Sequence, residues 1–162
     1  MTYLSIFQWI ESTALSTNIR ESEFLFPAII TVHCLTVFLS AGTIIALDLR
    51  LLGWGLKSTP LSVVFDQLRP WTLAAFVVNM ASGILLFWSE PVKCATTGSF
   101  IVKMVSLALL GVNALIFDRT VYPTLTSVDG SLTLPGKARF AGGMSLAFWA
   151  VVIFCGRWTA YF

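Results

Sequence analysis

Apolar residues form four long runs along the chain, and shorter polar segments separate them. The runs cover residues 24–47, 71–89, 100–117 and 142–162. A helix needs about 20 consecutive apolar residues to cross the hydrocarbon core of a bilayer, so each run has the length expected for a transmembrane helix. The polar segments contain five of the six prolines and most of the charged residues, which is typical of loops. They cover residues 48–70, 90–99 and 118–140.

The first 23 residues show a different pattern, in which apolar residues recur at helical spacing between polar ones. The apolar positions are Leu4, Phe7, Ile10, Leu15 and Ile19. One apolar face and one polar face are typical of an amphipathic helix that lies in the membrane interface. We therefore expect such a helix over residues 1–23. We expect no cleaved signal peptide, because no basic residue precedes Arg20.

Polar and small residues within the four spans recur at helical spacing, which places them on one face of each helix. In the first two spans they are His33, Thr36, Ser40, Thr43, Thr72, Asn79 and Gly83, and the second series continues to Glu90. In the last two they are Lys103, Ser106, Asn113, Gly142, Ser145, Trp149 and Gly156. Because polar groups are costly in hydrocarbon, these faces are expected to turn toward one another. The prediction is an all-α, integral membrane four-helix bundle with an N-terminal amphipathic interfacial helix, forming a single domain over residues 1–162.

The composition excludes several other classes of protein. Apolar residues make up 57% of the 162 residues and charged residues only 11%, against about 45–50% and about 25% in an average soluble domain. The formal net charge of +2 is too small to indicate a nucleic acid as a partner. The sequence lacks the motifs of nucleotide binding, zinc proteases, serine hydrolases and covalent heme attachment, so it does not decide whether the protein is an enzyme.

The distribution of Lys and Arg predicts the orientation in the membrane. The segments 48–70 and 118–140 carry six of these residues: Arg50, Lys57, Arg69, Arg119, Lys137 and Arg139. The opposite side carries three: Arg20, Lys93 and Arg157. Because cytoplasmic loops are richer in Lys and Arg, we expect these two segments in the cytoplasm and both chain ends on the outer side.

His33 is the single histidine of the chain and lies near the predicted midplane of the first span. One interpretation is that it binds a b-type heme or a metal ion, with Met80, Met104 or a second subunit supplying another ligand. The other interpretation is a buried, hydrogen-bonded histidine that fixes helix packing. One histidine does not supply a bis-histidine heme site within a single chain.

Charged residues near the two ends of the predicted bundle form two further groups. Lys103 lies at the depth of Glu90 and Arg157, so we expect an outer ionic cluster. For Lys103, an ion pair with Glu90 and a role in proton transfer or anion binding are both open. At the other end we expect a charged collar, made of Asp48 with Arg50 and Asp118 with Arg119.

Several other residues have structural and functional interpretations. Asn79 and Asn113 are suited either to hydrogen bonds between helices or to binding a ligand. Cys34 is expected to be a small buried residue. Cys94 and Cys155 both lie near the outer end of the predicted bundle, where a disulfide between them is an open alternative.

A set of residues spread over nearly the whole chain carries a resemblance to a known family. It consists of the segments 19–22, 26–27, 48–53, 70–71 and 156–162, together with His33, Gly42, Lys103 and Asn113. In these residues the chain resembles a family of bacterial four-helix inner-membrane proteins of unknown function. Lys103 and Asn113, with one histidine in the first span, are more distantly similar to copper-resistance D membrane domains and HemJ-type heme-binding proteins. The resemblance implies the bacterial inner membrane, and the predicted orientation then places both chain ends in the periplasm.

Two hypotheses about function follow. In the first, the protein is a redox-associated membrane subunit that holds a b-type heme or a metal ion through His33. In the second, it is a non-catalytic structural or accessory subunit of a larger membrane complex. Both imply contact with lipid and assembly as a homo-oligomer or with other membrane or periplasmic subunits. In both, a structural polar interior is formed by Thr36, Ser40, Asn79, Glu90, Lys103, Asn113 and Arg157.

Overall fold

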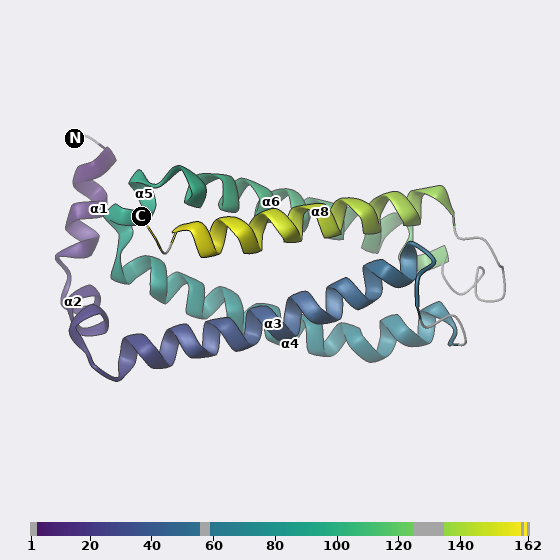
Figure 1. The fold of residues 1–162 in the computed structure, drawn as a ribbon, viewed down its shortest axis with the longest axis horizontal. Coiled ribbons are helices and arrows are strands. Elements are labelled where there is room, and N and C mark those ends of the chain that lie inside the picture. Colours follow the sequence, from purple (N-terminus) through teal and green to yellow (C-terminus); the bar gives the residue numbers. More distant parts are fainter. Residues whose placement is uncertain (1–2, 56–58, 125–134, 160, 162) are drawn as a thin grey trace.

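A computed structural model of the chain describes residues 3–55, 59–124, 135–159 and 161, and it contains helices but no strand within these residues (Figure 1). The elements in order are α1 (Tyr3–Glu11), α2 (Ala14–Glu21), α3 (Leu25–Leu51), α4 (Leu61–Ser89), α5 (Pro91–Thr96), α6 (Gly98–Thr120), η1 (Tyr122–Thr124) and α8 (Gly136–Thr159). The all-α prediction is confirmed. Lys57, one of the basic residues behind the predicted orientation, lies outside the described residues.

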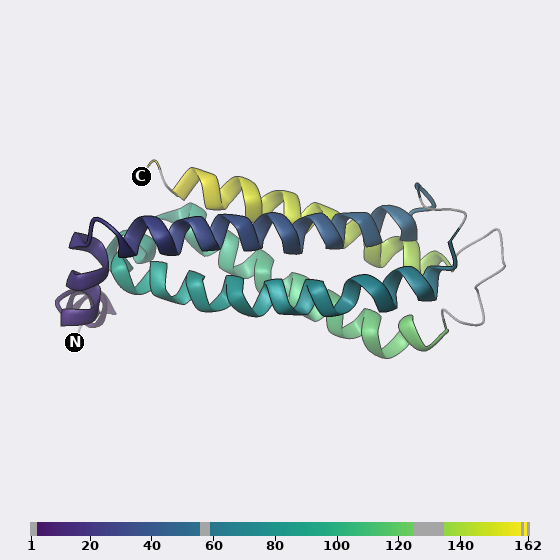
Figure 2. The same cartoon turned by 90° about the horizontal axis from the view of Figure 1, so that it is seen from below.

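Four of the helices, α3, α4, α6 and α8, are long and apolar enough to cross a membrane. They run lengthwise beside one another, and the two chain ends lie at the same end of the bundle (Figures 1 and 2). Large apolar side chains cover the outside, as Phe38 with 80% and Phe154 with 64% of its surface exposed illustrate. Such a surface requires lipid rather than water, so the chain is a multi-pass membrane protein.

The helices extend into segments that were predicted to be loops. α3 continues to Leu51, and α4 begins at Leu61 and contains Pro70, so the loop prediction was wrong for residues 61–70. The physical reason is a second amphipathic pattern, in which apolar residues of the first turns of α4 pack against the ends of α3 and α6. This cluster contains Leu47, Leu51, Leu61, Val64, Phe65, Phe117, Val121, Ala138 and Ala141. The predicted loop at 90–99 likewise contains the short helix α5.

The N-terminal segment forms two helices rather than the single one predicted over residues 1–23. The break lies at Ser12 and Thr13, whose hydroxyls donate to the backbone carbonyls of Trp9 and Ile10 and so compete with helix continuation. The Thr13 hydroxyl also accepts a hydrogen bond from the Ser16 backbone N–H, which caps α2. Both helices lie across one end of the bundle (Figure 1).

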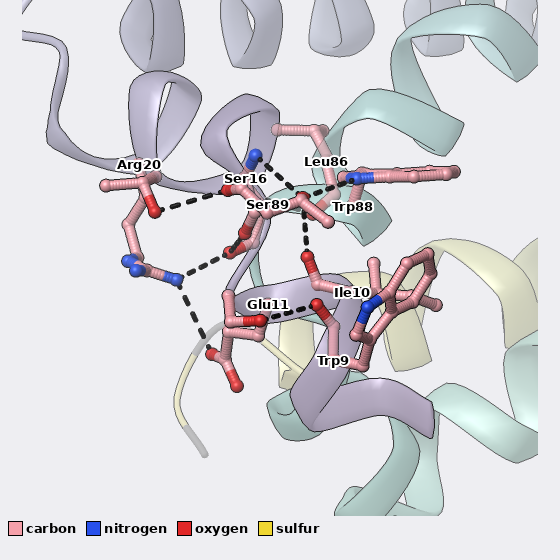
Figure 3. A network of polar contacts seen from close by, with 11 residues as sticks. Trp9, Ile10, Glu11, Ser16, Arg20, Leu86, Trp88 and Ser89 are labelled. Carbon is pink, nitrogen blue, oxygen red and sulfur yellow. Dashed lines mark hydrogen bonds and ion pairs between the residues drawn. The ribbon is translucent and has the colours of Figure 1, made fainter. Parts of the chain in front are cut away.

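Hydrogen bonds fix this N-terminal pair to the end of α4 (Figure 3). The Ser16 hydroxyl and the Arg20 guanidinium both donate to the carbonyl oxygen of Ser89, at 3.2 and 3.3 Å. The Trp88 indole N–H donates to the Thr13 hydroxyl at 3.2 Å. The last carbonyls of a helix lack partners within the helix, so α2 supplies donors and a positive charge where α4 needs them.

The long helices pack as two pairs, α3 with α4 and α6 with α8, and the contact between α3 and α8 joins the pairs. The α3–α8 contact is closest at Gly142. A Cβ atom at this position would lie 3.1 Å from both the backbone oxygen of Asp48 and the Cβ of Leu51. Glycine therefore allows the two backbones to approach at this point.

Candidate functional site

The residues of the polar faces predicted for the four spans are buried or half-buried in the structure. Ser40, Ser106, Gly142, Ser145 and Trp149 are buried. The half-buried members are His33, Thr36, Thr43, Thr72, Asn79, Gly83, Glu90, Lys103, Asn113 and Gly156. Thr36 and Ser40 donate to carbonyls of their own helix, so their hydroxyl protons are not available to a neighbouring helix or a ligand.

His33 packs against α4, where its Nδ1 lies 3.0 Å from the hydroxyl oxygen of Ser82. Ser82 is buried, and its hydroxyl donates its one proton to the backbone carbonyls of Val78 and Asn79, at 2.9 and 3.0 Å. The contact between Nδ1 and the Ser82 oxygen is a hydrogen bond whose donor depends on the tautomer of the ring. The ring also forms a hydrogen bond with the backbone of Asn79, so two groups of α4 fix its orientation.

Two residues of α4 complete the surroundings of the His33 ring. A Cβ atom at Gly83 would lie 3.3 Å from Cε1 of His33, so the absence of a side chain there lets the ring lie against the helix backbone. The side-chain oxygen Oδ1 of Asn79 is buried and has no hydrogen-bond partner. A buried amide oxygen without a partner is uncommon in proteins and needs an explanation.

Lys103 is half-buried and does not form the predicted ion pair with Glu90. Two features account for the difference. The helix α5 lies between Glu90 and α6 in the chain, and Gly156 on α8 leaves room for the lysine, whose Nζ lies 3.8 Å from the position of a Cβ there. Lys103 is close enough to His33 to interact with it electrostatically.

Arg157 departs from its predicted place in the polar interior. Its side chain is exposed, and its guanidinium donates to the hydroxyl of Tyr161 at 2.9 Å and stacks over the same ring. The two residues are four positions apart, so this is a contact within one surface at the chain end. The outer ionic cluster is therefore not formed: Lys103 and Arg157 point to different surroundings.

Asn113 makes the kind of contact that links helices. Its side-chain N–H donates to the backbone oxygen of Ala141 on α8 at 3.1 Å. The hydroxyls of Thr43 and Thr72 form a second link, between α3 and α4, at 2.8 Å. Such hydrogen bonds hold transmembrane helices together in the absence of a hydrophobic driving force between them.

The residues considered as additional ligands differ in exposure. Met104 is 45% exposed, and Cys34 is exposed rather than buried as expected. Cys34 faces outward because it follows His33 by one residue, which turns it about 100° around the helix. Met80 is half-buried beside Asn79. No group of three or more His, Cys, Asp or Glu side chains suited to a metal ion occurs among the described residues.

Cys94 and Cys155 are free thiols in this structure. Cys94 lies on α5, outside the membrane-spanning helices, where burial and then the nearby Glu90 carboxylate raise the pKa of its thiol. Both thiols lie within electrostatic range of Lys103. The disulfide considered from the sequence is not formed in this structure.

The charged collar expected at the other end has different members. Asp48 is buried with 5% of its surface exposed, and Arg50 donates to the backbone oxygen of Thr59 at 3.1 Å. Residues two apart on a helix point in different directions, which is why Asp48 and Arg50 do not pair. Asp118 pairs with Arg69 of α4 at 2.7 Å rather than with its neighbour Arg119.

A family model covers residues 6–162, which is nearly the whole chain. The protein belongs to a family of unknown function (DUF6644). No curated protein and no solved structure matches the chain. The family match supports the predicted membership in a family of unknown function, while the more distant relation to copper-resistance D and HemJ-type proteins stays a prediction.

Ser82 is the site residue that the sequence did not single out. It anchors the His33 ring from the neighbouring helix, yet serine is common in membrane spans and by itself indicates nothing. The available signal was its position, three residues after Asn79 and next to Gly83, on the face already identified as polar.

Proposed function

We propose that this membrane protein is a redox-associated subunit that binds a b-type heme through Nε2 of His33. The observation that carries the proposal is the orientation of the ring: Nδ1 lies 3.0 Å from the Ser82 hydroxyl, so Nε2 is the nitrogen that would bind the iron. Histidines that bind metals commonly donate their other ring N–H to an oxygen acceptor, which fixes both the tautomer and the direction of the free nitrogen.

The neighbouring residues fit such a group. The unpartnered Oδ1 of Asn79 is a buried acceptor on the same face of α4 as Ser82, and Gly83 keeps the helix surface beside the ring free of a side chain. Lys103 takes part in neither ion pair found within the described residues, and it would be the cation for a carboxylate substituent of a ligand. A bound heme would supply one-electron transfer, and Ser82 would hold the ligating ring in place.

Because the chain has a single histidine, any second protein ligand to a heme would come from another kind of residue or from another chain. Met80 is the half-buried candidate within the chain, and a second copy or another membrane subunit is the alternative. We therefore propose assembly as a homo-oligomer or with other membrane or periplasmic subunits. The proposed location is the bacterial inner membrane, with both chain ends in the periplasm, on the basis of the Lys and Arg distribution.

An absorption spectrum of the purified, detergent-solubilised protein, before and after addition of hemin, tests the proposal. We expect a Soret band that His33→Ala abolishes while the protein remains folded and inserted. Cys34→Ala is the matched control, since Cys34 is the next residue on α3 and is exposed, and it should leave the band unchanged. A wild-type protein that takes up no heme would overturn the proposal and favour the accessory-subunit alternative.

A further inference from the structure

Asp48 is the one buried carboxyl group among the described residues. It lies on α3 one turn before the helix ends at Leu51, where α3 crosses α8. An ionisable group inside a membrane bundle is costly to keep, and such groups commonly mark sites through which ions or protons pass. The position of Asp48 therefore calls for an explanation beyond packing.

The two carboxyl oxygens of Asp48 have different surroundings. The Ser145 hydroxyl of α8 donates a hydrogen bond to the carboxyl group, while Oδ2 is buried and has no hydrogen-bond partner. A fixed negative charge would need several donors or a cation at this place. One neutral hydroxyl does not meet that need, so the surroundings suit a carboxylic acid better than a carboxylate.

The charged groups of the neighbouring elements do not compensate Asp48. Arg50, on the same helix, donates through Nη2 to the Thr59 carbonyl, and its buried Nε has no hydrogen-bond partner, so it does not donate to Asp48. On α4, Asp66 and Arg69 are engaged with residues of η1 and α6. On α8, Lys137 and Arg139 are exposed, and neither ion pair found within the described residues includes Asp48.

We propose that Asp48 is a proton-binding site at the α3–α8 crossing. The proton comes from a hydronium ion in the water at the nearby end of the bundle: its O–H bond breaks and leaves neutral water, and an O–H bond forms at Oδ2 while Ser145 continues to donate to the other oxygen. A metal ion would need several more oxygen ligands than Asp48 and Ser145 provide. The inference does not depend on whether His33 binds a heme, since the two residues lie on different helix contacts.

Infrared spectroscopy of the full chain in lipid, as a function of pH, tests this proposal. At neutral pH we expect a carbonyl band of a protonated carboxyl group that is lost in Asp48→Asn. Asp66→Asn and Asp118→Asn are matched controls, because both carboxyl groups are exposed, and they should retain the band. Absence of the band from the wild-type protein, or its persistence in Asp48→Asn, would overturn the proposal.

A second variant keeps the test decisive if Asp48→Asn fails to fold. Ser145→Ala retains the carboxyl group and removes the hydroxyl that donates to it. The carbonyl band should then move to higher frequency, because the C=O bond stiffens when it loses a hydrogen-bond donor. A band that keeps its position in Ser145→Ala would contradict the proposed site.

Discussion

Two ionisable side chains of α3, His33 at the contact with α4 and Asp48 at the contact with α8, lie in contrasting surroundings. His33 is half-buried, and a neighbouring helix fixes one of its nitrogens. Asp48 is almost fully buried, and one of its oxygens lacks any hydrogen-bond partner. Burial alone does not distinguish the two roles proposed for them. The distinction comes from how each group is held: the Ser82 hydroxyl of α4 contacts Nδ1 of His33, whereas Oδ2 of Asp48 has no hydrogen-bond partner.

The largest predicted effect is on the free energy of unfolding, and it differs between the helix contact beside Asp48 and the one beside His33. Gly142→Ala should destabilise the protein by about 1–3 kcal/mol, because the added methyl group would press on the backbone of α3 at Asp48. Gly83→Ala should cost less, since the His33 ring it meets can shift. Thermal unfolding in detergent measures both.

Gly111→Ala is the matched control, because nothing lies within 4 Å of a Cβ there and the substitution favours the helix by about 0.5–1 kcal/mol. The predicted difference between the two helix contacts is wrong if Gly142→Ala is as stable as the wild-type protein, or if Gly83→Ala lowers the stability more than Gly142→Ala does.

A second prediction concerns the anchoring of His33. Ser82→Ala removes the hydroxyl that forms the hydrogen bond with Nδ1, and loss of such a supporting contact typically weakens metal binding about 10–100-fold. Heme titration followed by the Soret band measures this change. Ser106→Ala is a control with a buried serine on another helix, and it should leave heme affinity unchanged. Equal affinities for wild type and Ser82→Ala would show that the ring is not held in this way.

A third prediction concerns which end of the helix bundle faces the outside of the cell. The raised pKa of Cys94 lowers its thiolate fraction, so its alkylation at neutral pH should be slower than that of a small-molecule thiol and should accelerate as pH rises. A membrane-impermeant maleimide added to intact cells should reach Cys94 from the outside, with Cys94→Ser as the unlabelled control. Labelling that requires broken cells would reverse the predicted orientation and place Asp48, not His33, nearer the periplasm.

The smallest effect is expected at the exposed ion pair near Asp48. Arg69 and Asp118 lie 2.7 Å apart, with 41% and 44% of their side-chain surfaces exposed. A double-mutant cycle with Arg69→Ala and Asp118→Ala should give a coupling of about 0.2–1 kcal/mol, which decreases in high salt. A much larger coupling would mean that this end of the bundle is shielded from water.

The fold was predictable where one physical requirement dominated the sequence. Apolar runs that must avoid water give the four spans, and the cost of polar groups in lipid orients Lys103 and Asn113 inward. The start of α4 was missed because Pro70 was taken as a loop residue, although Leu61, Val64 and Phe65 already have helical spacing. Helix ends outside a membrane depend on local packing rather than on hydropathy.

The candidate site was predictable only in part, because its contacts depend on the register between helices. His33 stands out as the single histidine, but its partner Ser82 is fixed by how α3 lies on α4. Asp48 was assigned to a surface collar because it directly follows the apolar run. The close approach at Gly142 buries it instead, and no feature within α3 alone indicates that approach.

The hydrogen bonds that fix α2 to Ser89 also constrain the order in which the chain is assembled during synthesis. Ser16 and Arg20 bond to a residue 73 and 69 positions further along the chain. The ribosome has not made this partner when the first two helices emerge. These helices must therefore wait, on the membrane surface or with a chaperone, until α3 and α4 have both been inserted. The N-terminal segment is thus synthesised first and docks only after the first hairpin is complete.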